Sequence, residues 1–300
     1  MTMFTGCGTA LVTPFRKDQS LDEDAVRRLV RRQIDAGINF LVPCGTTGEN
    51  PTLTRLDHLR LVGITVDEAR KDHIPVLAGA GGYNTAEVIE LAREVKAAGA
   101  DGILSVTPYY NKPSQEGLYQ HYKALASAVS IPIVVYSVQS RTAVNIEPAT
   151  MKRLAEIDNI VGVKEASGNL AQVASILAQV PDRFNVLSGD DAVALPVIAL
   201  GGRGLISTTS NEIPAEMAEL VDTSRRGDLV TARQILRRYL PLIEVNFIES
   251  NPIPVKAAMA LMGLLEPVWR LPLVPPKPES QTRIEKVLTA LGLIPVHAAS

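Results

Sequence analysis

Lys164 stands inside an apolar stretch, IVGVKEAS at residues 160 to 167, where a charged side chain is unexpected. No other stretch of this kind in the chain contains a lysine. Burial disfavours the charged form of an amine, and a neutral amine is the nucleophile that attacks a carbonyl carbon to form a Schiff base. The alternative for a strand lysine is a salt bridge or a snorkelling stem. An enclosed Lys164 therefore predicts imine chemistry on a carbonyl compound.

Other polar side chains come at the ends of neighbouring apolar stretches. They are Thr46 and Thr47 in GTTGE, Tyr109 and Tyr110 in VTPYYN, Tyr136 in VVYSVQSRT, and Arg141 just beyond it. Hydroxyl groups can relay protons, and a guanidinium can bind a carboxylate bidentately. Each residue alone could equally be a turn residue, a packing aromatic or a loop charge. Their common position at the ends of the stretches indicates that they share one site with Lys164.

The elements that must position these residues alternate regularly along the chain. Apolar stretches rich in Val, Ile, Leu and Thr begin near residues 8, 39, 74, 102, 131, 160, 184 and 204, and segments with helical spacing separate them. Strands that are apolar on both faces and separated by helices indicate a parallel sheet, and eight such units indicate a (β/α)8 barrel over residues 1–226. A doubly wound open sheet is the alternative, but its GxGxxG fingerprint is incomplete, because Asn84 takes the last place in AGAGGYN. Three further helical segments form a C-terminal helical extension over residues 227–296.

The barrel prediction also assigns directions to the side chains around Lys164. Because alternate strand residues point inward, we expect Ile160 and Gly162 to share the inner face with Lys164, and Val161, Val163 and Glu165 to share the other face. Lys164 lies toward the C-terminal end of its strand, and barrel active sites sit at that end. The sequence therefore places the site at the carboxyl end of the barrel.

Composition and cysteine content exclude several other classes of protein. The chain of 300 residues is 46% hydrophobic, has a formal net charge of −2 and contains only Cys7 and Cys44. This predicts a globular protein without a nucleic-acid-binding stripe, a disulfide framework or a CxxC site, in which both thiols are buried. No apolar run reaches the roughly 18 residues of a membrane-spanning helix, and the start lacks the pattern of a signal peptide. We expect a cytoplasmic protein with small-molecule partners and no contact with a membrane.

The sequence offers no good metal or phosphate site. His58, His73, His121 and His297 fall in expected helices, a loop and the tail rather than at strand ends, which argues against a metal-dependent aldolase. Asp190 and Asp191 are expected to cap the helix that follows them. GGRG at 201 to 204 precedes a strand, so it is expected to form a tight turn at the opposite end of the barrel. We therefore expect neither a metal nor a cofactor.

Several motifs, in order along essentially the whole chain, resemble the dihydrodipicolinate synthase family. They are GTTGE at 45, VTPYYNKPSQEGLYQHY at 106, Tyr136 followed by Lys164 in GVKEASGN, LSGDD at 187 and NPIPVK at 251. The resemblance implies that Lys164 forms an imine with pyruvate and that Tyr136 is the general acid and base beside it. It also implies that Thr46 and Tyr110 complete a proton relay, with Tyr110 reaching into the site of a neighbouring subunit.

The same resemblance implies the substrates and the remaining site residues. Thr46 and Thr47 would hold the carboxylate of pyruvate, Arg141 would hold that of L-aspartate semialdehyde, and Gly189 and Ile206 would line the site. The implied product is 4-hydroxytetrahydrodipicolinate, the precursor of diaminopimelate and lysine. The implied assembly is a homotetramer built as a dimer of dimers, and no cofactor is implied.

The chain departs from the family pattern in two places. Ser137, Gln139 and Ala143 replace the usual asparagine, proline and glycine near Arg141, and losing the last two is expected to affect the loop that aims the guanidinium. His58, Glu87 and Tyr109 match the site at which feedback-inhibited members bind lysine. The usual serine, alanine, histidine and asparagine of that site are replaced by Asn50, Pro51, Arg55 and Tyr83. The added guanidinium predicts weak or absent inhibition by lysine.

Two other functions remain open at this point. One is a different pyruvate Schiff-base lyase, such as an N-acetylneuraminate lyase, a keto-deoxy-sugar-acid aldolase or a related dehydratase. Tyr110 and Arg141 favour the synthase, because the sugar-acid enzymes need hydroxyl-binding groups in their place. The other is a non-catalytic sensor of a keto acid, against which the complete set of relay residues argues.

Overall fold

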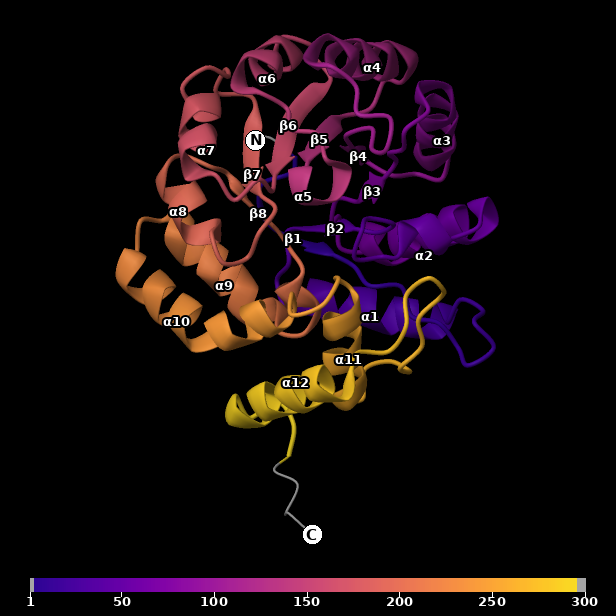
Figure 1. Ribbon diagram of the computed structural model, residues 1–300, viewed down its shortest axis with the longest axis vertical. Helices are drawn as coiled ribbons and strands as arrows, with labels where there is room; N and C mark the ends of the chain where they lie inside the picture. Colours follow the sequence, from indigo (N-terminus) through magenta and orange to yellow (C-terminus); the bar gives the residue numbers. More distant parts are fainter. Residues whose placement is uncertain (1–2, 296–300) are drawn as a thin grey trace.

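The computed structural model describes residues 3–295 and contains a parallel eight-stranded barrel (Figure 1). The strand order is β2-β1-β8-β7-β6-β5-β4-β3, and a bridge between Leu41 and Val76 closes the circle between β2 and β3. The strands are β1 Gly6–Ala10, β2 Phe40–Val42, β3 Leu77–Gly79, β4 Gly102–Val106, β5 Ile133–Ser137, β6 Ile160–Glu165, β7 Asn185–Ser188 and β8 Gly204–Ser207. The predicted (β/α)8 barrel is confirmed.

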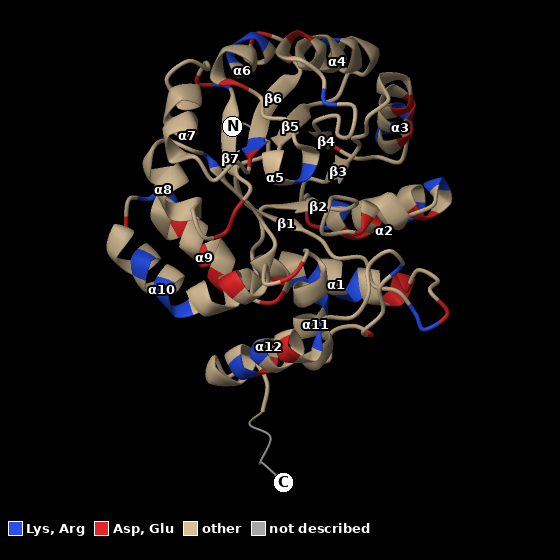
Figure 2. Cartoon of the chain, viewed as in Figure 1, with Lys and Arg blue, Asp and Glu red and all other residues tan. Residues whose placement is uncertain are grey.

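Helices surround the strands, and Figure 1 looks along the barrel. The surrounding helices are α1 Glu23–Asp35, α2 Arg55–Arg70, α3 Thr85–Ala97, α4 Gln115–Ala128, α6 Pro148–Ala155, α7 Leu170–Leu177, α8 Ala194–Ala199 and α9 Pro214–Arg225. The short α5 Gln139–Thr142 follows β5, and one-turn 3-10 helices cover Asn50–Thr52 and Thr209–Asn211. Most charged residues belong to the outer helices and loops (Figure 2).

Large aromatic side chains close the amino end of the barrel. The rings of Phe4 and Phe40 meet edge to face with centroids 5.7 Å apart, and both are fully buried. A Cβ atom on Gly8 would lie 2.2 Å from the Phe40 ring, so glycine leaves the space that this ring fills. Phe4 also accepts a hydrogen bond from Asn185, the first residue of β7, through its carbonyl oxygen. These side chains fill the interior of the barrel at its amino end.

A β-bulge in β6 corrects part of the prediction for the strand of Lys164. Ile133 pairs with Ile160, but the next residue of β5 pairs with Gly162, so β6 contains one extra residue. The extra residue turns Ile160 to the outer core, where it clusters with Val163. The expected direction was therefore wrong for Ile160 and for Val161, which packs against the inner core. Beyond the bulge the alternation holds, and Lys164 reaches the barrel interior.

Three helices follow the barrel as predicted. They are α10 Leu229–Val245, α11 Ile253–Leu261 and α12 Pro278–Ala290. Helix α10 packs on α9, and α12 packs on both α10 and α11. The domain boundary that we propose after residue 226 falls between α9 and α10, and residue 296 lies outside the described residues. The segment between α10 and α11 returns to the carboxyl end of the barrel, where Phe247 and Asn251 line a cavity.

Both cysteines and the glycine turn lie where the sequence places them. Cys7 and Cys44 are buried free thiols, and burial raises the pKa of each. The GGRG segment links α8 to β8 at the amino end of the barrel. Between residues 3 and 295, the structure contains no helix that is long and apolar enough to span a membrane.

Candidate active site

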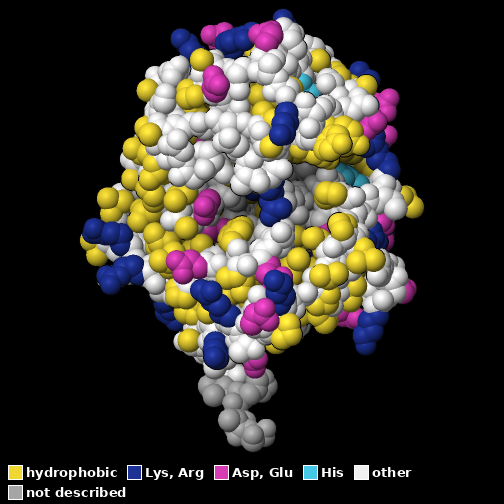
Figure 3. All heavy atoms as spheres, in the orientation of Figure 1, with side chains coloured by type: hydrophobic (Ala, Val, Ile, Leu, Met, Phe, Trp, Pro, Cys, Tyr) yellow, Lys and Arg dark blue, Asp and Glu magenta, His cyan; other side chains and the backbone are white. Residues whose placement is uncertain are grey.

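Two adjoining cavities open at the carboxyl end of the barrel, and Figure 3 shows this face hollowed near its middle. The first, which we call the Lys164 cavity, has a volume of about 210 Å³. Its lining consists of Thr46, Thr47, Tyr136, Val138, Ser140, Arg141, Lys164, Ala166, Gly189, Asp190, Thr208, Phe247 and Asn251. The second, the Tyr109 cavity, has a volume of about 220 Å³ and shares Thr46, Tyr136, Val138 and Arg141 with the first. Most of the predicted site residues therefore converge.

Lys164 is enclosed and stands directly beside Tyr136. The two residues are partners in the register of β5 and β6, and Nζ of the lysine lies 4.4 Å from the centroid of the tyrosine ring. Lys164 is 5% exposed, and it forms no ion pair within residues 3–295. The other deeply buried lysine, Lys256, is paired with Glu49. The arrangement of Lys164 suits a nucleophile rather than a structural ion pair.

Gly189 and Ile206 shape the space around the lysine. A Cβ atom on Gly189 would lie 3.0 Å from Cε of Lys164 and 2.7 Å from Cβ of Ala166. Ile206 is fully buried in the inner core together with Tyr136 and Leu187, the β7 residue that pairs with Lys164. The predicted lining role therefore agrees with the position of Gly189, whereas Ile206 supports the site from within the barrel.

The loop after β2 carries Thr46 and Thr47 into the site. Thr46 lines both cavities, and Oγ1 of Thr47 accepts a hydrogen bond of 2.9 Å from Nδ2 of Asn251. Two residues that bound this loop, Cys44 and Glu49, have positive φ angles of 58° and 54°, a conformation that L-residues seldom adopt. Such a conformation persists where surrounding contacts hold it.

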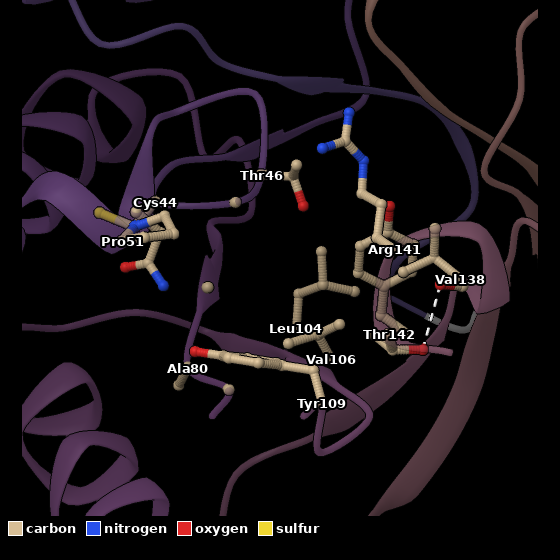
Figure 4. A pocket seen from close by; sticks show the side chains of 15 residues that line it. Cys44, Thr46, Pro51, Ala80, Leu104, Val106, Tyr109, Val138, Arg141 and Thr142 are labelled. Carbon is tan, nitrogen blue, oxygen red and sulfur yellow. Dashed lines mark hydrogen bonds between the residues drawn. The ribbon is translucent and has the colours of Figure 1, made fainter. Parts of the chain in front are cut away.

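Arg141 lies in α5 and also lines both cavities, despite the substitutions around it. Ala143 adopts a φ of 58° at the end of this helix, where the family's usual glycine would be unstrained. Gln139 is the first residue of α5, a position at which proline is favoured but not required. One Nη atom of Arg141 donates to the carbonyl oxygen of Asn251 over 3.1 Å. The altered loop thus still presents the guanidinium, opposite Thr46 (Figure 4).

Tyr110 is the predicted catalytic residue that does not line either cavity of its own chain. Its side chain is 92% exposed, and its φ angle is 69°. The neighbouring Tyr109 points into the second cavity (Figure 4) and packs edge to face on Tyr83 at 5.3 Å. Burial and the nearby Tyr83 and Glu87 raise the pKa of Tyr109.

Of the predicted regulatory residues His58, Glu87 and Tyr109, only Tyr109 lines the Tyr109 cavity, together with the substituted positions Asn50 and Pro51. Glu87 accepts a hydrogen bond of 2.9 Å from Nδ2 of Asn84, at the start of α3. His58 is buried in α2, and desolvation is the main cause that lowers its pKa to about 4. The guanidinium of Arg55 forms an ion pair of 2.6 Å with Glu94. The positive charge that this chain adds to the region is therefore partly compensated.

The two aspartates after β7 do not cap α8, so this expectation was wrong. Asp191 is buried and accepts hydrogen bonds from the hydroxyl of Ser207 and from N–H of Thr208. Burial raises the pKa of Asp191 to about 6. Oδ1 of Asp190 accepts a 2.9 Å hydrogen bond from N–H of Ala192 and so closes a local turn. The capping expectation failed because the side chain of Asp191 turns to the end of β8 rather than to the helix.

Sequence reasoning missed several residues of the site. Asn251 donates to Thr47 and accepts from Arg141, so one residue of the C-terminal segment contacts two of the predicted substrate-binding side chains. Thr208 lies 3.5 Å from Thr47 between the two Oγ1 atoms, and Phe247 is 47% exposed at the cavity. The NPIPVK motif contains Asn251, but its sequence position alone indicated no contact with the site.

The described part of the chain contains no group of three or more His, Cys, Asp or Glu side chains that could hold a metal ion. Of the histidines, His58 and His121 are buried in α2 and α4, and His73 follows α2 at the far end of the helix. His297 lies outside the described residues. The polar groups at the cavities are hydroxyls, amides, two cations and one carboxylate. Such groups bind organic acids.

The parallel barrel and the enclosed lysine at its carboxyl end are those of a barrel enzyme of the lyase class. Residues 3–291 match the model of the "Dihydrodipicolinate synthetase family". The 4-hydroxy-tetrahydrodipicolinate synthase of Koribacter versatilis is 53% identical over 96% of each chain. The dihydrodipicolinate synthase structure from Aquifex aeolicus has a TM-score of 0.95 and 42% identity, covering 98% of this chain and all of the other. The chain belongs to the dihydrodipicolinate synthetase family.

A further solved structure is of interest because of its ligand. It is the chloride-inhibited dihydrodipicolinate synthase from Acinetobacter baumannii, complexed with pyruvate. It has a TM-score of 0.95 and 41% identity to this chain, and the matched region covers 97% of this chain and 99% of the Acinetobacter baumannii chain. The similarity therefore includes the whole barrel and the C-terminal helices.

Proposed function

We propose that the protein condenses pyruvate with L-aspartate semialdehyde through a Schiff base on Lys164, giving 4-hydroxytetrahydrodipicolinate in the diaminopimelate and lysine pathway. The observation that carries the proposal is the enclosed Lys164 beside Tyr136, in a cavity that also presents Arg141. A pyruvate-bound relative with the same fold supports the first substrate. A relative of 53% identity that carries the synthase name supports the reaction.

The geometry suggests how the steps divide among the residues. The Nζ atom of Lys164 attacks C2 of pyruvate, and loss of water leaves a protonated imine that makes the methyl group acidic. The hydroxyl of Tyr136, on the adjacent strand, serves as the proton donor and acceptor for these steps, with Thr46 next to it in both cavities. Thr46 and Thr47 bind the carboxylate of pyruvate.

The second half of the reaction uses the other end of the Lys164 cavity. Loss of a methyl proton converts the imine to an enamine, whose carbon attacks the aldehyde carbon of L-aspartate semialdehyde. Arg141 binds the carboxylate of this substrate. The substrate's own amine then attacks the imine carbon, which forms the ring and releases Lys164. No step requires a group that the chain does not supply.

The proposal is tested by turnover of the purified protein and of two lysine variants. Consumption of L-aspartate semialdehyde with pyruvate, coupled to dihydrodipicolinate reductase, should be robust in the native protein and absent in Lys164→Ala. Lys152→Ala, which removes an exposed lysine of α6, is the control and should retain activity. Borohydride with pyruvate should add a reduced adduct at Lys164. If pyruvate is trapped on Lys164 but there is no turnover, the second substrate must be a different aldehyde. If no pyruvate adduct forms, a non-catalytic keto-acid sensor is favoured.

We also propose a homotetramer, arranged as a dimer of dimers, in the cytoplasm. Support comes from the exposed apolar side chains near the cavities, since Tyr110 is 92%, Leu56 78% and Tyr83 53% exposed. A second copy covering them would bring Tyr110 toward the neighbouring site, where it would complete the proton relay. Light scattering after gel filtration should give four times the chain mass, and cell fractionation tests the compartment. A monomer with full activity would contradict the relay role of Tyr110.

A further inference from the structure

The charges that line the Lys164 cavity leave one side chain without an assigned role. The lining contains two basic residues, Lys164 and Arg141, and within the described chain a single acidic one, Asp190. Figure 3 shows a basic and an acidic side chain on opposite sides of the hollow. A buried or half-buried carboxylate at a cavity wall is costly unless it has a partner. A positively charged group on a bound substrate would complement this carboxylate.

The two proposed substrates differ in the groups that they bring. Pyruvate carries a carboxylate and no cation, whereas L-aspartate semialdehyde carries both a carboxylate and an α-ammonium group. Arg141 complements the carboxylate. The ammonium needs an anionic or strongly polar acceptor, and Asp190 is the one anion in the lining. We infer that Asp190 recognises the α-ammonium group of the second substrate, an inference that rests on the proposed function.

The local structure holds Asp190 in a suitable place. It follows Gly189 directly, where a Cβ atom would lie 3.0 Å from Cε of the reactive lysine. Ser188 fixes the backbone of Asp190, because its hydroxyl donates to the Asp190 carbonyl oxygen over 2.7 Å. One carboxylate oxygen, Oδ1, accepts from N–H of Ala192, and the other, Oδ2, has no hydrogen-bond partner within residues 3–295. Oδ2 is therefore available to a ligand.

The adjacent aspartate cannot take this role. Asp191 is 1% exposed, and both of its oxygens accept hydrogen bonds, from Ser207 and from Thr208. Of the two neighbouring aspartates, Asp190 lines the cavity, whereas Asp191 holds the end of β8 through its hydrogen bonds.

Asp190→Asn isolates the charge from the fold. Asparagine keeps an oxygen for the hydrogen bond to Ala192, so the turn after β7 is preserved. The variant is compared with the native protein against two aldehydes, L-aspartate semialdehyde and succinic semialdehyde. The second has the same chain length, aldehyde and carboxylate but no ammonium group. Asp158→Asn, which alters an exposed aspartate at the other end of the barrel, is the matched control.

The readout is the same for both aldehydes. Enzyme loaded with pyruvate is mixed with the aldehyde and quenched with borohydride at set times, and mass spectrometry then follows loss of the pyruvate adduct at Lys164. Asp190→Asn should slow this loss roughly 10- to 100-fold with L-aspartate semialdehyde, the effect of one charge-assisted hydrogen bond. The rate with succinic semialdehyde and the initial yield of pyruvate adduct should be unchanged.

Each other outcome overturns a defined part of the reasoning. Equal slowing with both aldehydes would make Asp190 a positioning or proton-transfer residue, and no slowing with either would leave it a turn residue, so both results refute the inference. A native protein that traps pyruvate but never loses the adduct to L-aspartate semialdehyde would refute the proposed function, and the ammonium assignment with it.

Discussion

Lys256→Met should lower the free energy of unfolding by about 3–5 kcal/mol, because it leaves a buried carboxylate without its counter-ion. Lys256 of α11 and Glu49 at the end of the GTTGE loop are both completely buried and form an ion pair. The ammonium also donates to the carbonyl oxygen of Val268 over 2.7 Å, and N–H of Arg270 donates to Glu49 over 3.2 Å. Burial lowers the pKa of Lys256, and the charge of Glu49 opposes that shift.

A double-mutant cycle separates the pair from ordinary packing. Glu49→Gln alone leaves the buried ammonium of Lys256 without its counter-ion, whereas Glu49→Gln combined with Lys256→Met removes both charges. The loss in the double variant should therefore be at least about 2 kcal/mol smaller than the sum of the single losses. Urea unfolding followed by circular dichroism, at one fixed protein concentration, measures all four proteins. Lys152→Met, on the exposed face of α6, is the control and should leave stability unchanged.

The pair also has a functional consequence, because Glu49 bounds the loop that carries Thr46 and Thr47. A loosened loop should raise the KM for pyruvate in Lys256→Met under conditions where the variant remains folded. Single losses below about 1 kcal/mol, or a double loss equal to the sum, would show that the two charges do not depend on each other. An unchanged KM would show that the loop holds its shape without the ion pair.

Three further predictions concern the cavity, regulation and pH. Gly189→Ala places a Cβ atom 3.0 Å from Cε of Lys164, so formation of the pyruvate adduct should slow about 10-fold or more, and an unchanged trapping rate would contradict this. L-lysine should inhibit only above about 1 mM, because the guanidinium of Arg55, which Glu94 compensates only in part, adds positive charge to the region of a cationic ligand, and a submillimolar inhibition constant would refute the reasoning. Burial lowers the pKa of His121 from 6.5 to about 4, so the folded state binds fewer protons than the unfolded state. The contribution of neutral His121 to the free energy of unfolding is complete above pH 6.5 and falls by up to about 3 kcal/mol as the pH drops to about 4. His121→Asn, which keeps an acceptor for the Thr85 hydroxyl 2.9 Å from Nδ1, should lose less stability over that range in urea unfolding, and equal losses would contradict the assignment.

Much of the barrel was predictable because its determinants are local. Each strand is a short apolar stretch, each helix has its own periodicity, and alternate strand residues face opposite sides. That alternation, together with the rule that barrel sites form at the carboxyl end, sufficed to place Lys164, Tyr136, Thr46 and Arg141 near one another. The direction of Ile160 was mispredicted because a bulge depends on the register of two strands, which neither strand shows alone.

The sequence by itself determined which elements carry the reactive residues. It placed a lysine on one strand, a tyrosine on the strand before it, and threonines and an arginine in loops at the same end of the barrel. Only the tertiary structure decided which distant residues complete the site. Asn251 reaches Thr47 across 204 positions of the chain, and Asp191 turns to β8 rather than to its own helix. The exposure of Tyr110 is likewise decided by packing around it. Such contacts depend on how loops from separate elements pack together, and the spacing of residues along the chain does not predict that packing.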